Sequence, residues 1–375
     1  MNILIITNAY PSTPDGIYGS FVREFALKLN NLGHKVVINT PAKEKKYQLD
    51  LNLIMKPLSW KTKEIALNSL NLLYPLNWLI LMHFFIAGRK TTIETVKKYK
   101  ISRVFCLWVI PSGLFGLWIK IITNIPYDIW ALGSDIWQVK KIPLIGKYLL
   151  KKILQNADRV FADGVSLASE VESIAKVKCK FLPSVRKLPP AKLNFSPFKQ
   201  KNKIHLLFVG RYHYNKGPDL LLNAISYLPS DIKKSIQLHM FGEGKLKNKL
   251  ERMIINLKLQ QYVNLNGAIY MQNFSNYLSL VSFLLIPSRI ESIPVVFSDA
   301  IQKGIPIITT PTGDLPRLIN HYKCGILAKE ITPNAFSIAI EKALKTKKNN
   351  FIRGLKKAAH DFNISHTVQQ WLKEL

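Results

Sequence analysis

The sequence contains few cysteines and few acidic residues. Its three cysteines, Cys106, Cys179 and Cys324, are odd in number and far apart, and no CxxC pair or histidine cluster accompanies them. Neither a disulfide framework nor a structural zinc site is therefore indicated. The 23 Asp and Glu stand against 53 Lys and Arg, which gives a net charge of +30. Such a charge attracts nucleic acid, anionic membranes or acidic substrates without choosing among them.

A long apolar run is also missing. The most apolar stretch, residues 70–87, is shorter than the roughly 20 residues of a membrane-spanning helix and is interrupted by Pro75 and by polar side chains. We therefore expect no spanning helix. Two interpretations remain open: a helix packed within the first domain, or a surface that dips into a lipid interface with Tyr74 and Trp78 as amphipathic anchors.

No basic leader or cleavage site precedes the first apolar strand, residues 2–7. We expect a cytoplasmic protein, and the apolar segment leaves contact with the cytoplasmic face of a membrane open.

Apolar strand patterns alternate with amphipathic helical patterns along the whole chain, which is typical of parallel α/β architecture. The length of 375 residues favours two domains. A proline-rich basic stretch near residues 182–203 predicts the connection between them. The predicted organisation is two Rossmann-like doubly wound domains that face each other across a cleft. The boundaries are 1–185 for the first domain, 186–203 for the linker, 204–350 for the second domain and 351–375 for C-terminal helices that pack back towards the first domain.

The junction at 283–304 is the most informative part of the chain. A predicted strand at 283–286 leads into a loop with Glu291, and a helix opens at about Val295 with Asp299 one turn inside. A helix start presents N–H groups and a positive dipole end to an anion. Carboxylates beside the helix start can accept hydrogen bonds from the hydroxyl groups of a ligand. A nucleotide sugar combines phosphates and hydroxyls and fits this junction.

Two further loops follow predicted strands of the second domain. The first runs from Gly210 to Gly217 and carries Arg211 and Lys216, two cations that could neutralise a departing diphosphate. Solvated loop cations are the alternative in so basic a protein. The second places Glu243 between two glycines, which permits either close approach to a ligand or a plain turn.

The first domain offers weaker signals. A glycine-containing loop that ends at Gly19 precedes a helix and is a plausible phosphate cradle, but it is not a GxGxxG motif, so an NAD site is not indicated. Asp135 follows the predicted strand 127–132 and either faces the cleft or caps the next helix.

These motifs together resemble glycosyltransferase family 4, the retaining nucleotide-sugar transferases with the GT-B fold. Gly210-Arg211 with Lys216-Gly217 resembles the family's GR…KG motif, and Gly242-Glu243-Gly244 resembles its G-(D/E)-G turn. The stretch 287–306 resembles its PS…EGxP…E…CGxPV block. Upstream, the stretches 19–24, 33–36, 108–113 and 133–135 resemble its first loop and helix and its HW…PxG and HGSD segments.

The resemblance implies a role for each matching residue. Arg211, Lys216 and Glu291 would be catalytic, with the two cations on the donor diphosphate and Glu291 against the sugar. Asp299 stands at the second Glu of the family's E-x7-E motif, which holds the ribose. The implied donor-binding residues are Gly19, Gly210, Gly242, Glu243, Ile293, Val295 and Asp299, and Asp135 and Trp108 lie on the acceptor or sugar side.

Three positions depart from the family pattern. Asp299 is one methylene shorter than Glu, Leu107 and Leu132 replace common histidines, and Asp314 replaces a glycine. None of these changes removes the diphosphate cations, so we expect an active enzyme.

The resulting prediction is a retaining, metal-independent hexosyltransferase without a cofactor. It would move a sugar from a UDP-sugar, or from a GDP-sugar, to a glycan or lipid-linked glycan in cell-surface polysaccharide or glycolipid synthesis. A nucleotide-sugar epimerase and a catalytically impaired GT-B relative are alternatives. A basic nucleic-acid-binding protein is a distant one, because no finger, aromatic RNP stripe or recognition-helix pattern is present.

Overall fold

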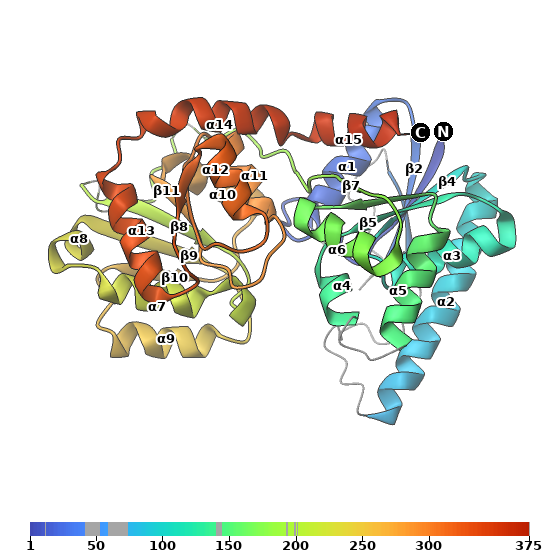
Figure 1. Ribbon diagram of the computed structural model, residues 1–375, viewed down its shortest axis with the longest axis horizontal. Helices are drawn as coiled ribbons and strands as arrows, with labels where there is room; N and C mark the ends of the chain where they lie inside the picture. Colours follow the sequence, from blue (N-terminus) through green and yellow to red (C-terminus); the bar gives the residue numbers. More distant parts are fainter. Residues whose placement is uncertain are drawn as a thin grey trace. The chain divides into compact units, whose positions relative to one another are not determined.

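The computed structural model describes residues 1–11, 13–41, 53–58, 74–139, 145–192, 194–198, 200 and 202–374 (Figure 1). The chain forms two compact units. Unit 1 comprises Met1–Leu182 together with Val368–Leu375, and unit 2 comprises Pro183–Thr367.

Within the described part of unit 1, seven parallel strands form one sheet in the order β3-β2-β1-β4-β5-β6-β7. The strands are β1 (Asn2–Ile6), β2 (Lys35–Pro41), β3 (Ile54–Leu58), β4 (Arg103–Leu107), β5 (Tyr127–Ala131), β6 (Arg159–Ala162) and β7 (Cys179–Phe181). The order reverses between β1 and β4, so this sheet is doubly wound with its switch point there.

Helices cover both faces of this sheet (Figure 1). They are α1 (Ser20–Asn31), α2 (Pro75–Tyr99), α3 (Ser112–Thr123), α4 (Ser134–Val139), α5 (Ile145–Asn156) and α6 (Val165–Ala175). Helix α3 packs against both α2 and α5, and α5 packs against α6. The final helix, α15 (Ile364–Lys373), brings the buried Trp371 onto Phe25 of α1 and Phe105 of β4.

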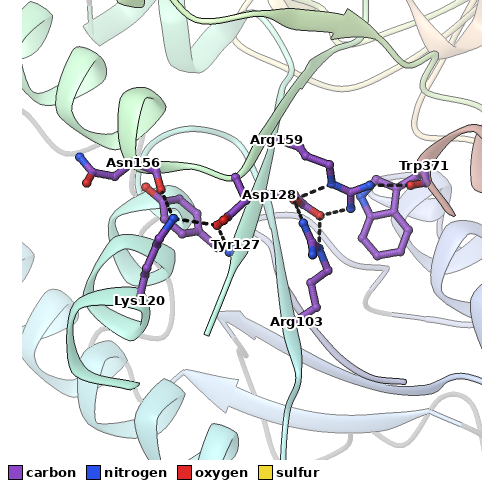
Figure 2. A network of polar contacts seen from close by, with 8 residues as sticks. Arg103, Lys120, Tyr127, Asp128, Asn156, Arg159 and Trp371 are labelled. Carbon is purple, nitrogen blue, oxygen red and sulfur yellow. Dashed lines mark hydrogen bonds and ion pairs between the residues drawn. The ribbon is translucent and has the colours of Figure 1, made fainter. Parts of the chain in front are cut away.

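Asp128 is a fully buried carboxylate at the centre of a charge network in unit 1 (Figure 2). Arg103 donates to it at 2.7 and 2.8 Å, and Arg159, its cross-strand neighbour on β6, donates at 2.9 Å and through a second contact. Arg159 also donates to the backbone oxygen of Trp371 at 2.8 Å. The buried negative charge is thereby compensated, and the same cation anchors the end of the chain to the sheet.

Six parallel strands form the sheet of unit 2 in the order β10-β9-β8-β11-β12-β13. They are β8 (Ile204–Val209), β9 (Ile236–Phe241), β10 (Val263–Asn266), β11 (Phe283–Ile286), β12 (Ile307–Thr309) and β13 (Gly325–Leu327). This order matches that of β1 to β6 in unit 1, and the switch point lies between β8 and β11. The predicted strand 283–286 is confirmed.

The helices of unit 2 lie on both faces of its sheet. They are α7 (Pro218–Tyr227), α8 (Ser230–Ser235), α9 (Lys247–Asn256), α10 (Met271–Leu280), α11 (Val295–Gln302), α12 (Leu315–Tyr322), α13 (Pro333–Lys345) and α14 (Asn349–Asp361), with a short 3-10 turn η2 (Tyr214–Lys216). Helix α7 packs against α9 and α13, whereas α14 packs against α11 and α12. The predicted helix start at Val295 is confirmed.

The stretch that we predicted as a linker lies within unit 2. Its backbone is held there by side chains from α10 and α11: Ser275 donates to the oxygen of Pro189, and Gln302 donates to the oxygen of Arg186 at 3.0 Å. Of the C-terminal residues 351–375, those up to Thr367 also belong to unit 2, and Val368–Leu375 belong to unit 1.

The apolar stretch 74–87 opens α2, and residues 70–73 lie outside the described part of the chain. Among the described helices, none combines the length and the apolar character that crossing a bilayer requires.

Candidate functional site

The switch point of unit 2 collects the loops that follow β8 and β11. These strands are hydrogen-bonded neighbours, and their carboxyl ends lie at one edge of the sheet. In doubly wound sheets this is the place where ligands bind. The predicted residues Arg211 and Lys216 follow β8, and Glu291 follows β11.

Lys216 and Glu291 form an ion pair across this switch point. Their side chains remain 25% and 16% exposed, so both charges are accessible to a ligand. The two loops are joined by their backbones, because Asn215 accepts hydrogen bonds from the N–H groups of Arg289 at 2.7 Å and Ile290 at 3.3 Å. The structure thus brings together two of the three predicted catalytic side chains.

Gly217 permits this close approach of the two loops. Its φ of +65° lies in the left-handed region, and a Cβ there would stand 1.9 Å from the backbone oxygen of Pro287. A larger residue would push the β8 loop away from the β11 loop and separate Lys216 from Glu291.

Arg289 is a site residue that the sequence interpretation missed. Its guanidinium donates to both oxygens of Asp219, at 2.8 and 3.0 Å, and lies 4.1 Å from the centre of the Tyr214 ring. Burial raises the pKa of the Asp219 carboxyl, but the hydrogen bonds and charge of Arg289 outweigh it, and the net pKa is lowered. The pair fixes the β11 loop to the first turn of α7. The sequence feature that could have indicated it is Asp219, an acidic residue in that first turn.

Arg211 points a charged group into solvent at the end of β8. Its side chain is exposed and has no hydrogen bond or ion pair with another described residue. The next strand end lies close by, because a Cβ on Gly242 would stand 2.0 Å from the oxygen of Gly210. Gly210, Arg211 and Gly242 therefore lie together. Because neither glycine has a side chain, a ligand could approach the backbone here closely.

The turn at 242–244 is tied to the β8 loop. Tyr212 donates its N–H to the oxygen of Glu243 at 2.9 Å, and a Cβ on Gly244 would stand 2.5 Å from the oxygen of Tyr212. The Glu243 carboxylate is exposed and lies 3.3 Å from the ammonium of Lys247, the first residue of α9. Glu243 is thus placed beside the same edge as Lys216 and Glu291.

The start of α11 supplies backbone N–H groups at this edge. The helix begins at Val295 after Pro294, and its first N–H groups have no acceptor within the helix. Val295 is half-buried, whereas the side chain of Ile293 is buried and anchors the turn. Gly313 supports the turn from the β12 side, because a Cβ there would stand 2.2 Å from the oxygen of Glu291.

Asp299 lies deeper than the other predicted donor residues. It is fully buried, and its two oxygens accept from Arg186 at 2.5 and 3.0 Å. Burial raises the pKa of the Asp299 carboxyl, and the charge of Arg186 opposes that rise. Arg186 is itself almost fully buried against the ring of Phe274. In this structure neither carboxylate oxygen of Asp299 is exposed, so neither is accessible for the predicted contact with a ribose.

The other predicted residues belong to unit 1. Gly19 precedes α1 with a φ of +73°, and a Cβ there would meet the backbone of Ala9 and Tyr10 at 2.7 Å. It lets the loop after β1 pack tightly against the helix start. This loop stands beside the switch point of the unit 1 sheet.

Asp135 and Trp108 lie at the carboxyl ends of β5 and β4. The buried Asp135 carboxylate accepts from the N–H of Val109 at 2.6 Å and from the N–H of Leu132 at 3.2 Å. Burial raises the pKa of Asp135 to about 6, although these hydrogen bonds oppose the shift. Trp108 is half-buried, has a φ of +72° and packs edge-on against Phe21. Asp135 therefore shapes the strand-end loops from within.

Among the described residues, no three His, Cys, Asp or Glu side chains are grouped so as to hold a metal ion.

Residues 191–360, which cover most of unit 2, match the family described as glycosyl transferases group 1. An uncharacterized glycosyltransferase of Methanocaldococcus jannaschii is 24% identical over 274 residues, which cover 72% of each chain. The Campylobacter jejuni protein named GalNAc-alpha-(1->4)-GalNAc-alpha-(1->3)-diNAcBac-PP-undecaprenol alpha-1,4-N-acetyl-D-galactosaminyltransferase is 25% identical over 181 residues, 48% of this chain and 49% of that protein. The crystal structure of Anabaena HepE in complex with UDP-glucose superposes with a TM-score of 0.74 at 15% identity, over all of both chains.

The two parallel sheets and these likenesses define a GT-B protein of the α/β class. In sequence, the chain is similar to glycosyltransferases of the group 1 type.

Proposed function

We propose that the protein is a retaining, metal-independent hexosyltransferase that uses a nucleoside-diphosphate sugar, with a UDP-sugar favoured over a GDP-sugar. The observation that carries the proposal is the accessible Lys216–Glu291 pair at the switch point of unit 2. The superposition with a protein crystallised with UDP-glucose supports the donor class.

Lys216 and Arg211 would stabilise the departing diphosphate. In the ligand-free structure the Lys216 charge is balanced by Glu291, and the exposed Arg211 has no anionic partner among the described residues. A diphosphate that binds here meets two cations and the N–H groups at the start of α11. Gly210, Gly242 and Val295 would contact it through backbone, and Glu243 would bind a hydroxyl of the donor.

Glu291 would lie against the transferred sugar and orient it. The anomeric carbon would lose its bond to the phosphate oxygen and gain a bond to the acceptor oxygen on the same face. The acceptor proton would pass to the departing phosphate oxygen, so no separate base is required. The diphosphate charge would be stabilised by protein cations instead of a metal ion.

The ribose contact of Asp299 stays a prediction. Both of its oxygens are held by Arg186, so a ribose hydroxyl can reach the carboxylate only after that pair opens. In the closed arrangement Asp299 would act by fixing α11. Trp108 and Asp135 would shape the acceptor or sugar side in unit 1, and Gly19 would contribute to donor binding.

The acceptor that we propose is a glycan, or a glycan carried on a lipid, in cell-surface polysaccharide or glycolipid synthesis. The name of the Campylobacter relative describes a substrate linked to PP-undecaprenol, which supports a lipid-linked acceptor.

The test is a transfer assay with UDP-, GDP- and ADP-sugars and a panel of free and lipid-linked glycans, in buffer with a chelator. We expect release of the nucleoside diphosphate and a product whose anomeric configuration, read by NMR, equals that of the donor. A product of inverted configuration, or activity that the chelator abolishes, would contradict the proposed mechanism. Conversion of the donor without an acceptor would instead identify an epimerase.

A further inference from the structure

Helix α2 is far longer than the strand that follows it. Its 25 residues span about 37 Å, whereas the five residues of β4 span about 17 Å. The C-terminal end of α2 is fixed beside the start of the sheet, because Asn2 of β1 donates to the backbone oxygens of Tyr99 and Lys100 at 3.0 Å each. The surplus length therefore lies at the N-terminal end, which Figure 1 shows extending beyond the neighbouring helices of unit 1.

The buried side of α2 begins only at Phe84. From there, Phe84, Gly88, Thr92 and Val96 face the core, and a Cβ on Gly88 would stand 2.4 Å from the Phe115 ring on α3. No described residue of α2 before Phe84 is buried. The fully buried core along α2 therefore begins only after its first two turns.

The N-terminal part of α2 is apolar on its exposed side. Leu79, Met82 and Ile86 recur at helical spacing and are 58%, 55% and 63% exposed, and Leu76 and Trp78 are also exposed beside them. We call these five residues the α2 tip. A contiguous exposed apolar face of this kind marks an interaction surface in a folded protein.

The topology places the α2 tip at the carboxyl-end edge of the unit 1 sheet. A helix that leads into a parallel strand runs antiparallel to it, so the N-terminal end of α2 lies where β4 ends. Trp108 and Asp135 follow strands at this same edge. The apolar surface and the residues proposed to receive the acceptor thus belong to one edge of one unit.

Basic residues border the α2 tip. Arg89 and Lys90 are exposed one turn further along the helix. Helix α5 leads into β6 and therefore starts at the same edge, with exposed Lys147 and Tyr148 in its first turns. Apolar side chains next to cations match a bilayer surface with anionic headgroups, and the net charge of +30 opposes association with a second copy.

We propose that the α2 tip inserts into the interface of an anionic phospholipid bilayer. Leu79, Met82 and Ile86 would enter the boundary between headgroups and acyl chains, while Arg89, Lys90 and Lys147 contact the headgroups. The carboxyl-end edge of unit 1 would then face the bilayer, where the glycan of a lipid-linked acceptor begins. This inference deepens the proposed function and rests on an acceptor carried by a lipid.

The experiment is vesicle co-sedimentation of the full chain without donor or acceptor. Vesicles of phosphatidylcholine alone are compared with vesicles that contain about one third phosphatidylglycerol. We expect salt-sensitive binding to the anionic vesicles. The triple variant Leu79→Gln, Met82→Gln, Ile86→Gln should lower the binding constant about tenfold or more, and Arg89→Gln with Lys90→Gln about thirtyfold on anionic vesicles only.

The matched control is Ile121→Gln. Ile121 is exposed on the last turn of α3, at the opposite edge of the same sheet, so its loss should leave binding unchanged. Unchanged binding of the triple variant, or an equal loss in the control, would overturn the proposal. Dissociation of a dimer by the triple variant in gel filtration would also overturn it, because a second copy would then cover the tip.

Two readouts separate this inference from the proposed function. Transfer to a soluble glycan tests the donor chemistry, and vesicle binding without substrates tests the α2 tip. A triple variant that keeps transfer to a soluble glycan but loses transfer to a vesicle-bound acceptor supports the docking role. If the wild type binds vesicles but has no transfer activity, the proposed function would be contradicted and the membrane-binding role of the α2 tip would still be supported.

Discussion

The two units share a strand order, but the carboxyl-end edges of their sheets carry different chemistry. In unit 2, Lys216, Glu291 and Arg211 keep solvent-exposed surface at the switch point. In unit 1, the Asp135 carboxylate is sealed against backbone N–H groups, and the exposed side chains of the α2 tip are apolar. An accessible charged side chain can exchange its partner for a ligand. A buried one is already bound by groups of the folded protein. This difference supports the proposal that the unit 2 edge binds the phosphates of the donor and the unit 1 edge receives the acceptor.

The same contrast exists within unit 2, on either side of the start of α11. The Lys216–Glu291 pair is open, and the Arg186–Asp299 pair has only 3% and 0% exposed side-chain surface. Removal of one partner from a buried pair leaves an uncompensated charge, and removal from an open pair does not. Loss of a partner from the Arg186–Asp299 pair should therefore lower stability, whereas loss of Lys216 from the open pair should mainly lower activity.

The largest expected effect on stability comes from Arg186→Met. It leaves the Asp299 carboxylate buried without its cation and should lower the free energy of unfolding by about 3–5 kcal/mol, measured by urea denaturation. The double variant Arg186→Met, Asp299→Leu should recover much of the loss, because no charge is then buried. A single variant within about 1 kcal/mol of wild type would show that the pair is not sealed in solution.

The next effect is on turnover. Lys216→Ala and Arg211→Ala should each lower kcat about a hundredfold or more, because each removes a cation from the proposed leaving diphosphate. Their unfolding free energies should change by only about 1 kcal/mol, since both side chains are exposed or half-exposed.

The control for the turnover measurement is Lys234→Ala. Lys234 is exposed on α8, which leads into β9 and lies away from the carboxyl-end edge, so its kcat should equal that of the wild type. Near-normal turnover in Lys216→Ala and Arg211→Ala would remove the phosphate role from the unit 2 edge and erase the contrast between the two units.

A smaller effect concerns the buried Asp135 of unit 1 and is measured as the pH dependence of the free energy of unfolding. Because burial raises the pKa of Asp135 to about 6, the folded state holds this proton more tightly than the unfolded state. Its contribution to stability is present below about pH 4 and is lost as the pH rises to about 6, with a span of about 2–3 kcal/mol. Asp135→Asn should remove this pH dependence, and Asp231→Asn, on the exposed α8, should keep it. Identical pH profiles for wild type and Asp135→Asn would show that Asp135 is hydrated.

The local parts of this architecture were predictable, and the long-range pairings were not. The strand 283–286, the helix start at Val295 and the strand-end loops followed from apolar runs and turn residues. The full length of α2 did not, because apolar side chains in its first half lie on exposed as well as buried positions and blur the helical periodicity. Arg186 and Asp299 are 113 positions apart, and Arg289 and Asp219 are 70 apart. Only the folded sheet brings such partners together, so no spacing rule could have revealed that Asp299 is already occupied.

The smallest expected effect tests whether Glu243 contacts the donor or only water and Lys247. Its pair with Lys247 is exposed and links the 242–244 turn to the start of α9, so Glu243→Gln should change the unfolding free energy by less than about 0.5 kcal/mol. If Glu243 binds a hydroxyl of the donor, the same variant should weaken UDP-sugar binding about threefold to tenfold in calorimetry, because one charge-assisted hydrogen bond is lost. Lys247→Gln breaks the same pair without touching the donor and should bind the UDP-sugar as the wild type does. Equal affinities in all three proteins would confine the donor site to the ends of β8 and β11 and leave the 242–244 turn as support for the Tyr212 loop.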